Sequence, residues 1–198
     1  MHAMIGVPYH AETKFFRRQS VLCFLLCIPV ALMLASCALF GPSGVDTQGL
    51  SAEDRAFYNK YSKKFGICFT GAENKKLIRA IDGWLGAPYR LGGCSKKGVD
   101  CSCFVQTLYA TVYGIELKRS SREMFDDARL VSGKNLREGD LLFLKGKNST
   151  IFHVGIYLKE GKFVHVSTAR GVVISSLQEG YYRKYFHAGG RVAGNMYK

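Results

Sequence analysis

The chain has 198 residues, of which 47% are hydrophobic and 22% are charged, and its formal net charge is +13. This hydrophobic fraction is enough for one packed domain and excludes a largely disordered polymer. Twenty-two glycines and only four prolines suit a turn-rich mixed α/β domain. The Lys and Arg residues are scattered and form no long basic run, so we expect no nucleic-acid binding.

The first 36 residues have the organisation of a bacterial export signal. A basic stretch at 14–18 precedes an apolar run from Val21 to Leu34, which is shorter than the roughly 20 residues of a membrane-spanning helix. Residues 34–37 read Leu-Ala-Ser-Cys, which resembles the lipobox of bacterial lipoproteins. We therefore expect removal of residues 1–36 and acylation of Cys37. The protein would then face the periplasm from a membrane, and Ala38 after the cysteine favours the outer membrane.

The rest of the chain predicts helices first and strands afterwards. Residues 37–50 are typical of a flexible tether, 51–70 of a helical extension, and 71–198 of the main domain. Helical spacing of apolar residues predicts helices over 51–65, 72–85, 101–113 and 120–128. Alternating patterns then predict strands over 140–144, 153–158, 163–168, 172–175 and 191–195. This order predicts an α+β fold, with N-terminal helices packed on an antiparallel sheet of about five strands.

Four cysteines remain after the signal and the acylated residue: Cys68, Cys94, Cys101 and Cys103. Asp100 is a natural N-cap for the helix that starts at Cys101. Because a helix N-terminus favours a thiolate, we expect a lowered pKa at Cys101 and predict that it is a nucleophile. Cys94 would then pair with Cys68 or with Cys103, leaving one thiol free. The cysteine spacing matches no standard zinc site, so we expect no metal and no cofactor.

Two histidines on consecutive predicted strands provide a base. A three-residue loop at 159–161, with Gly161 left-handed and a β-bulge, places Gly155 opposite His165, and both His153 and His165 then lie on one sheet face. A two-residue turn would shift the register by one residue and separate them, so we predict the longer loop. His153 would take the thiol proton and His165 would orient its ring, although these roles are exchangeable. The opposite face would be core: Val154, Ile156, Leu158, Val164 and Val166.

Six segments, in order, resemble the NlpC family of cell-wall cysteine endopeptidases, which is also named for a sixty-kilodalton listerial protein. The resemblance runs from about Leu77 to Val192. Its segments are GAPYRLGG at 86–93, VDCS at 99–102, RSS at 119–121, LREGDLLF at 136–143, HVGIY at 153–157 and KFVHVS at 162–167. It implies a papain-like α+β fold and hydrolysis of peptide bonds in peptidoglycan stems, either the D-glutamyl–diaminopimelate bond or the cross-link between stems.

The resemblance also implies individual roles. Cys101 corresponds to the nucleophile, His153 to the base and His165 to the orienting residue. Tyr89 corresponds to a phenol that helps to hold the oxyanion, beside the Cys101 backbone N–H. The residues expected to line the substrate cleft are Asp100, Ser102, Arg119 and Ser120. Two positions depart from the family pattern, because Cys103 replaces a usual glycine and Met124 a common glutamine.

Three other functions remain open from the sequence. The first is a catalytically silent, lipid-anchored protein that binds the cell wall. The second is an acyltransferase or amidase with the same Cys-His-His set, and the third, which the scattered basic residues disfavour, is nucleic-acid binding. Our main expectation is a monomeric peptidoglycan endopeptidase whose partners are stem peptides and, through Cys37, the membrane.

Overall fold

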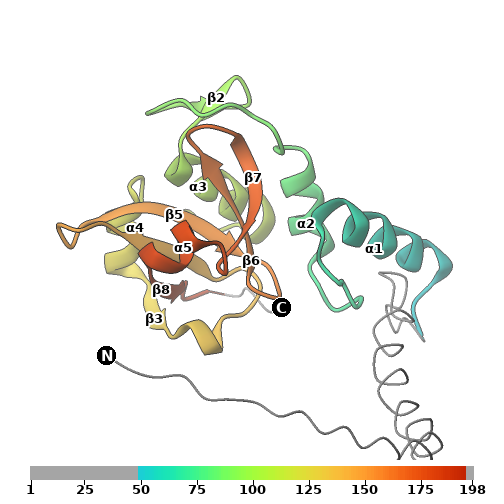
Figure 1. The fold of residues 1–198 in the computed structure, drawn as a ribbon. Helices are drawn as coiled ribbons and strands as arrows, with labels where there is room; N and C mark the ends of the chain where they lie inside the picture. The colour runs from blue at the N-terminus through green and yellow to red at the C-terminus, as the bar shows by residue number, and fades with distance from the viewer. Residues whose placement is uncertain (1–48, 195–198) are drawn as a thin grey trace, which may run out of the picture. The chain divides into compact units, whose positions relative to one another are not determined.

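The structure, a computed structural model, describes residues 49–194 (Figure 1). The predicted signal and the acylation of Cys37 lie outside the described residues. The helices are α1 (Ala52–Phe65), α2 (Lys75–Asp82), α3 (Cys101–Tyr113), α4 (Ser121–Asp127) and α5 (Gly180–Tyr185), with a short 3-10 turn at Gly133–Asn135. The strands are β1 (Cys94–Ser95), β2 (Gly98–Val99), β3 (Arg129–Val131), β4 (Leu141–Lys145), β5 (Ile151–Tyr157), β6 (Lys162–Ser167), β7 (Gly171–Ser176) and β8 (Phe186–Arg191).

Side-chain caps fix the starts of the first four helices. Ser51, Asn74 and Asp100 each accept a backbone N–H from the first turn of α1, α2 and α3. Ser120 and Glu123 form a reciprocal capping box at α4. The predicted helices are confirmed, although α2 is shorter than expected at both ends.

The main sheet has six antiparallel strands in the order β3-β8-β4-β5-β6-β7, one more than predicted. The prediction of a last strand over 191–195 was wrong, because β8 ends at Arg191 and follows the unpredicted helix α5. Gly189 and Gly190 interrupt the alternation of apolar and polar residues in β8, so the sequence pattern does not predict this strand. Both are glycines because Leu136 and Phe143 side chains lie within 2.5 Å of where a Cβ would stand. The α+β fold itself is confirmed.

The sheet has a core on each face. The larger core lies on the face where α3 and α4 pack on β5, and it extends through α2, which packs on α3, to the buried rings of Tyr58 and Phe65 on α1. The five strand residues predicted for this core are all buried in it, as expected: Val154, Ile156, Leu158, Val164 and Val166. Helix α5 covers the other face (Figure 1), where a smaller cluster consists of Leu142, Leu144 and Phe163 from the sheet and Tyr182 from α5.

The β5–β6 hairpin has the predicted register through a different turn. Gly155 pairs with His165, as expected. However, Glu160 and Gly161 both have positive φ, at 54° and 73°, and the Lys162 N–H donates to the Lys159 carbonyl. This is the two-residue turn that we had rejected. The register survives because the Leu158 N–H also donates to the Lys162 carbonyl, so a β-bulge restores the lost residue.

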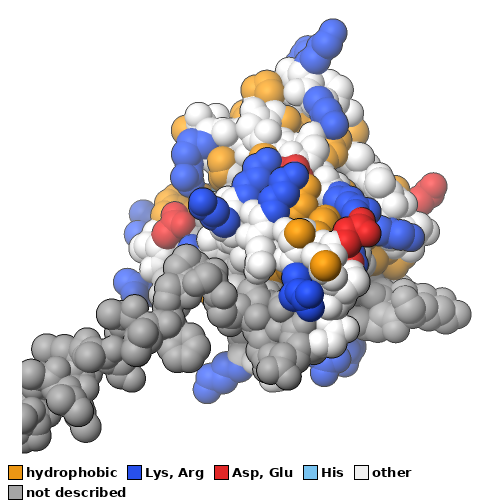
Figure 2. Space-filling model, turned by 90° about the vertical axis from the view of Figure 1, so that its right-hand side faces the viewer, with side chains coloured by type: hydrophobic (Ala, Val, Ile, Leu, Met, Phe, Trp, Pro, Cys, Tyr) orange, Lys and Arg blue, Asp and Glu red, His pale blue; other side chains and the backbone are white. Residues whose placement is uncertain are grey.

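Basic side chains are spread over the face shown in Figure 2 and form no continuous stripe. Few acidic side chains interrupt them there. In the part of the chain that the structure describes, none of the helices combines the length and the apolar character needed to cross a membrane.

We expect Gly155→Ala to destabilise the fold by roughly 1–3 kcal/mol, the usual cost of overpacking. A Cβ at Gly155 would lie 2.8 Å from the Val164 carbonyl oxygen and 3.1 Å from the His165 Cβ, so strands β5 and β6 would have to separate. Gly146→Ala is the matched control, because its Cβ would meet only ordinary contacts of 3.5 Å or more. Chemical denaturation measures both. Equal stability of the two variants would contradict the close approach at Gly155.

Candidate active site

Cys101 occupies the first turn of α3, at the edge of a pocket of about 430 Å³. The Asp100 side chain caps this helix by accepting the Cys103 N–H at 2.7 Å. The backbone N–H groups of Val154, on β5, and of Ser102 interact with the Cys101 sulfur. The nucleophile predicted from sequence therefore lies directly beside the strand that carries His153.

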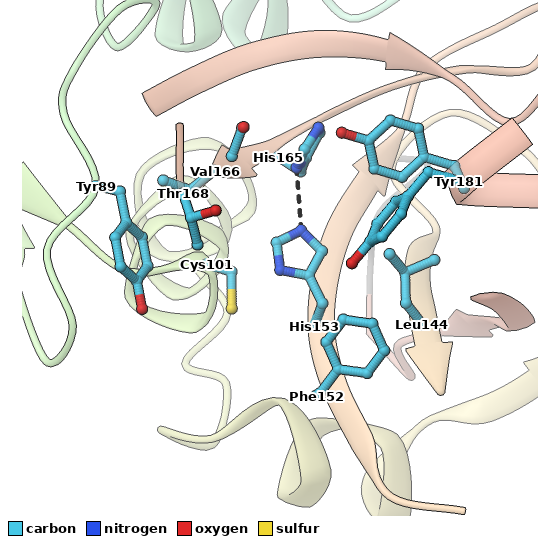
Figure 3. Close-up of a pocket in the computed structure, with 11 residues that line it drawn as sticks. Tyr89, Cys101, Leu144, Phe152, His153, His165, Val166, Thr168 and Tyr181 are labelled. Atoms are coloured by element: carbon cyan, nitrogen blue, oxygen red, sulfur yellow. Dashed lines mark hydrogen bonds between the residues drawn. The ribbon is translucent and has the colours of Figure 1, made fainter. Parts of the chain in front are cut away.

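His153 and His165 project into the same pocket and contact each other. Nε2 of His153 lies 3.0 Å from Nδ1 of His165, and the two rings are nearly perpendicular. Figure 3 shows the other nitrogen of the His153 ring on the side that faces the Cys101 sulfur. Beyond this pair, Nε2 of His165 lies 3.1 Å from the Ser175 hydroxyl. The three side chains singled out from sequence thus form one line from Cys101 to His165.

Burial controls the charge state of this line. Burial lowers the pKa of His153 to about 4, and burial together with the nearby His153 and Arg170 charges lowers the pKa of His165 to about 3. Burial also raises the pKa of the Cys101 thiol, and the Asp100 charge adds to this effect. The expected lowering of the Cys101 pKa is therefore wrong for the resting site, because desolvation outweighs the backbone N–H groups. At neutral pH the Cys101 thiol and the His153 ring are therefore both uncharged.

Asp100, Ser102 and Arg119 form a hydrogen-bonded network next to Cys101 at the start of α3. Arg119 donates to both carboxylate oxygens of Asp100, at 3.1 and 2.6 Å, and to the Ser102 hydroxyl at 2.8 Å. Burial opposes ionisation of Asp100, but the Arg119 guanidinium and the Cys103 N–H outweigh it and hold the pKa of this carboxyl below its usual value. Asp100 and Ser102 are buried, and these three residues are not among those that line the pocket.

The last residue predicted for the substrate cleft, Ser120, has its hydroxyl in the capping box of α4 with Glu123. It too is absent from the pocket lining. Met124, one of the two departures from the family pattern, is buried in the main core. The four predicted cleft residues therefore lie around the start of α3 and α4 and not in the pocket that contains the histidines.

Tyr89 lines the pocket, and in Figure 3 it lies on the opposite side of Cys101 from His153. A backbone bridge to Val99 holds it against the β1–β2 hairpin, which the sequence had not predicted. A disulfide between Cys94 and Cys103 ties this hairpin to α3 and settles the pairing that the sequence left open.

Cys68 is the leftover thiol and is exposed, while Cys101 is free and half-buried. The disulfide also removes two of the thiolates of the zinc alternative. Within residues 49–194, no cluster of His, Cys, Asp and Glu side chains could hold a metal ion.

Three aromatic side chains of the pocket were missed from sequence. Phe152 precedes His153 on β5, whereas Tyr181 and Tyr182 belong to α5. Phe152 and Tyr181 are 43% and 56% exposed, which is unusual for large rings and suits a surface that contacts a ligand. The available signal was the Gly-Tyr-Tyr sequence at 180–182. Because no helix had been expected there, nothing connected it to the histidines.

Comparison with known proteins identifies the family. The model of the NlpC/P60 family matches residues 86–191. The murein DD-endopeptidase MepS/murein LD-carboxypeptidase of Escherichia coli K12 is 36% identical in an alignment over 190 residues that covers 89% of this chain and 97% of that protein. A probable endopeptidase NlpC homolog of Haemophilus influenzae is 40% identical over 119 residues, 60% of this chain and 63% of that protein.

Solved structures agree with this match. A crystal structure of an NlpC/P60 family protein from Bacillus cereus is 30% identical, with a TM-score of 0.56. The match covers 60% of this chain and 39% of the Bacillus protein. Sequence and fold agree, and the chain belongs to the NlpC/P60 family.

Proposed function

We propose that the protein is a cysteine endopeptidase that hydrolyses peptide bonds in the stems of peptidoglycan. The observation that carries this function is the line of Cys101, His153 and His165 in one pocket, with 3.0 Å between the two rings. The curated relatives support this proposal, because the name of the Escherichia coli relative specifies murein and both names specify an endopeptidase. The DD-endopeptidase name of the Escherichia coli relative makes the cross-link between stems the first bond to test, ahead of the D-glutamyl–diaminopimelate bond.

In this proposal the thiol proton moves to His153 as the sulfur attacks. Because Cys101 and His153 are buried and uncharged, no thiolate is formed in advance. His153 therefore acts as a general base and removes the Cys101 proton as the sulfur approaches the substrate carbonyl. The carbonyl oxygen of the substrate gains negative charge in the tetrahedral intermediate. The Tyr89 hydroxyl and the Cys101 backbone N–H would donate to that oxygen. His165 is hydrogen-bonded to Nε2 of His153 and holds the His153 ring in the orientation that this proton transfer needs.

The second half of the reaction regenerates the enzyme. His153 gives its proton to the leaving amine, and the acyl group stays on Cys101 as a thioester. Water, deprotonated by His153, then attacks the thioester and releases the carboxylate. Stem peptides are extended, and the exposed rings of Phe152 and Tyr181 offer them a contact surface on the side of His153 away from the sulfur (Figure 3). Asp100, Ser102, Arg119 and Ser120 are proposed to shape the adjoining part of the cleft.

The test uses the protein from residue 38 onward and purified peptidoglycan, with mass spectrometry of the released fragments. We expect release by the wild type and none by Cys101→Ala or Cys101→Ser, because only Cys101 provides the attacking sulfur. Cys68→Ser is the matched control, since Cys68 is a free, exposed thiol outside the pocket lining, and it should keep full activity. Release by Cys101→Ala at the wild-type rate would refute the mechanism. Fragments that differ from a cut peptide stem would refute the substrate.

We further propose that Cys37 carries the lipid that holds the protein in the cell envelope, on the periplasmic side of the outer membrane. The basic stretch, the apolar run and the Leu-Ala-Ser-Cys ending support it. Cys37→Ser in the full chain, expressed in a bacterium, should move the protein from the membrane fraction to the soluble fraction. Cys68→Ser should leave it in the membrane fraction. Equal partition of wild type and Cys37→Ser would exclude the anchor.

A further inference from the structure

The line of polar groups in the pocket continues behind His165. Ser175, on β7, is 2% exposed, and its hydroxyl oxygen lies 3.1 Å from Nε2 of His165. In the β6–β7 pairing, Ser175 faces Phe163, two residues before His165, so both side chains lie on one sheet face. Arg170, in the turn before β7, donates an N–H to the same hydroxyl oxygen at 3.3 Å. Neither Ser175 nor Arg170 lines the pocket.

The proposed reaction fixes the direction of these hydrogen bonds. His153 can accept the Cys101 proton on Nδ1 only if Nε2 already carries a proton and donates it to Nδ1 of His165. His165 then carries its own proton on Nε2, and Ser175 must accept it. In the opposite arrangement both rings carry their protons on Nδ1. The nitrogen of His153 that faces Cys101 would then be occupied and could not act as a base.

We propose that Ser175 is a positioning residue that holds the two histidines in the base-competent tautomer, and that Arg170 keeps the positive charge on His153 during the reaction. The serine does so by accepting the buried N–H of His165, which has no access to water. The arginine does so by repulsion, because a proton that moved outward to His165 would lie next to a second cation. This inference rests on the proposed catalytic function.

The surroundings of His165 support the assignment. His165 is 1% exposed and stacks on Phe163, with ring centroids 4.9 Å apart. The titratable and charged groups around it are His153 from β5, Tyr182 from α5 and Arg170 from the β6–β7 turn, with Cys101 from α3 beyond His153. The Arg170 charge contributes to the lowered pKa of His165.

The first test compares Ser175→Ala with Ser176→Ala on soluble disaccharide-peptide fragments of peptidoglycan. Ser176 is the neighbouring serine of β7, and its hydroxyl contacts the Gln178 N–H, away from the histidines. We expect kcat to fall roughly 10- to 100-fold in Ser175→Ala, as the loss of a buried hydrogen-bond acceptor implies. KM should change little, and Ser175→Thr, which keeps the oxygen, should recover most of kcat.

Two outcomes of this test would overturn the proposal. One is an equal kcat in Ser175→Ala and Ser176→Ala. The other is an equal loss in Ser175→Ala and Ser175→Thr while both keep the thermal stability of the wild type. Failure of the wild type itself to cut the fragments would count against the proposed function and not against Ser175 alone.

A second test uses the exposed Arg170 and does not depend on whether variants at Ser175 fold. Arg170→Gln removes the cation, so the histidine pair should bind a proton more readily, and the acid limb of kcat/KM should move to higher pH. Arg170→Lys keeps the charge and should retain the wild-type limb. An acid limb that is identical in wild type and Arg170→Gln would overturn the role of the arginine.

Discussion

The hydrogen bond between His153 and His165 depends on the register of one hairpin. Both rings lie on the same face of the sheet because Gly155 pairs with His165, and a shift by one residue would place one ring in the main core. The other face of the same two strands carries the valines and isoleucine on which α3 packs. The packing that fixes the register therefore also brings Cys101, at the start of α3, to the histidines.

Burial then determines how the chemistry starts. The N-terminus of α3 does not lower the pKa of the resting Cys101 thiol on balance, because desolvation raises that pKa. Desolvation also lowers the pKa of His153. A neutral pair resembles the serine–histidine arrangement of serine peptidases more than a preformed thiolate–imidazolium pair. Asp100 fits this state, since its carboxylate caps the helix and pairs with Arg119, while its charge adds to the raised pKa of the Cys101 thiol.

Sequence reasoning predicted the parts of the fold whose signals are local. The cap at Asp100 and the alternating strands around the histidines were visible as patterns. Strand β8 was misplaced because its paired glycines accommodate side chains from elsewhere, which no local pattern records. The hairpin turn was wrong in type although its register was right, because the two turns differ in the backbone conformation at Glu160, which periodicity does not record. The sign of the Cys101 pKa shift was missed because burial belongs to the assembled pocket. The same holds for Ser175, which meets His165 only across a strand pair.

The protonation state of the His153 ring tests this account most directly. Nitrogen-15 NMR of the wild-type protein labelled at its histidines, with His153→Gln used to assign the signals, reports which ring nitrogens carry protons. At pH 7 the account predicts a neutral His153 ring with its proton on Nε2 and a bare Nδ1 toward Cys101, because burial lowers its pKa to about 4. A proton on Nδ1, or a doubly protonated His153 at the same pH, would contradict it.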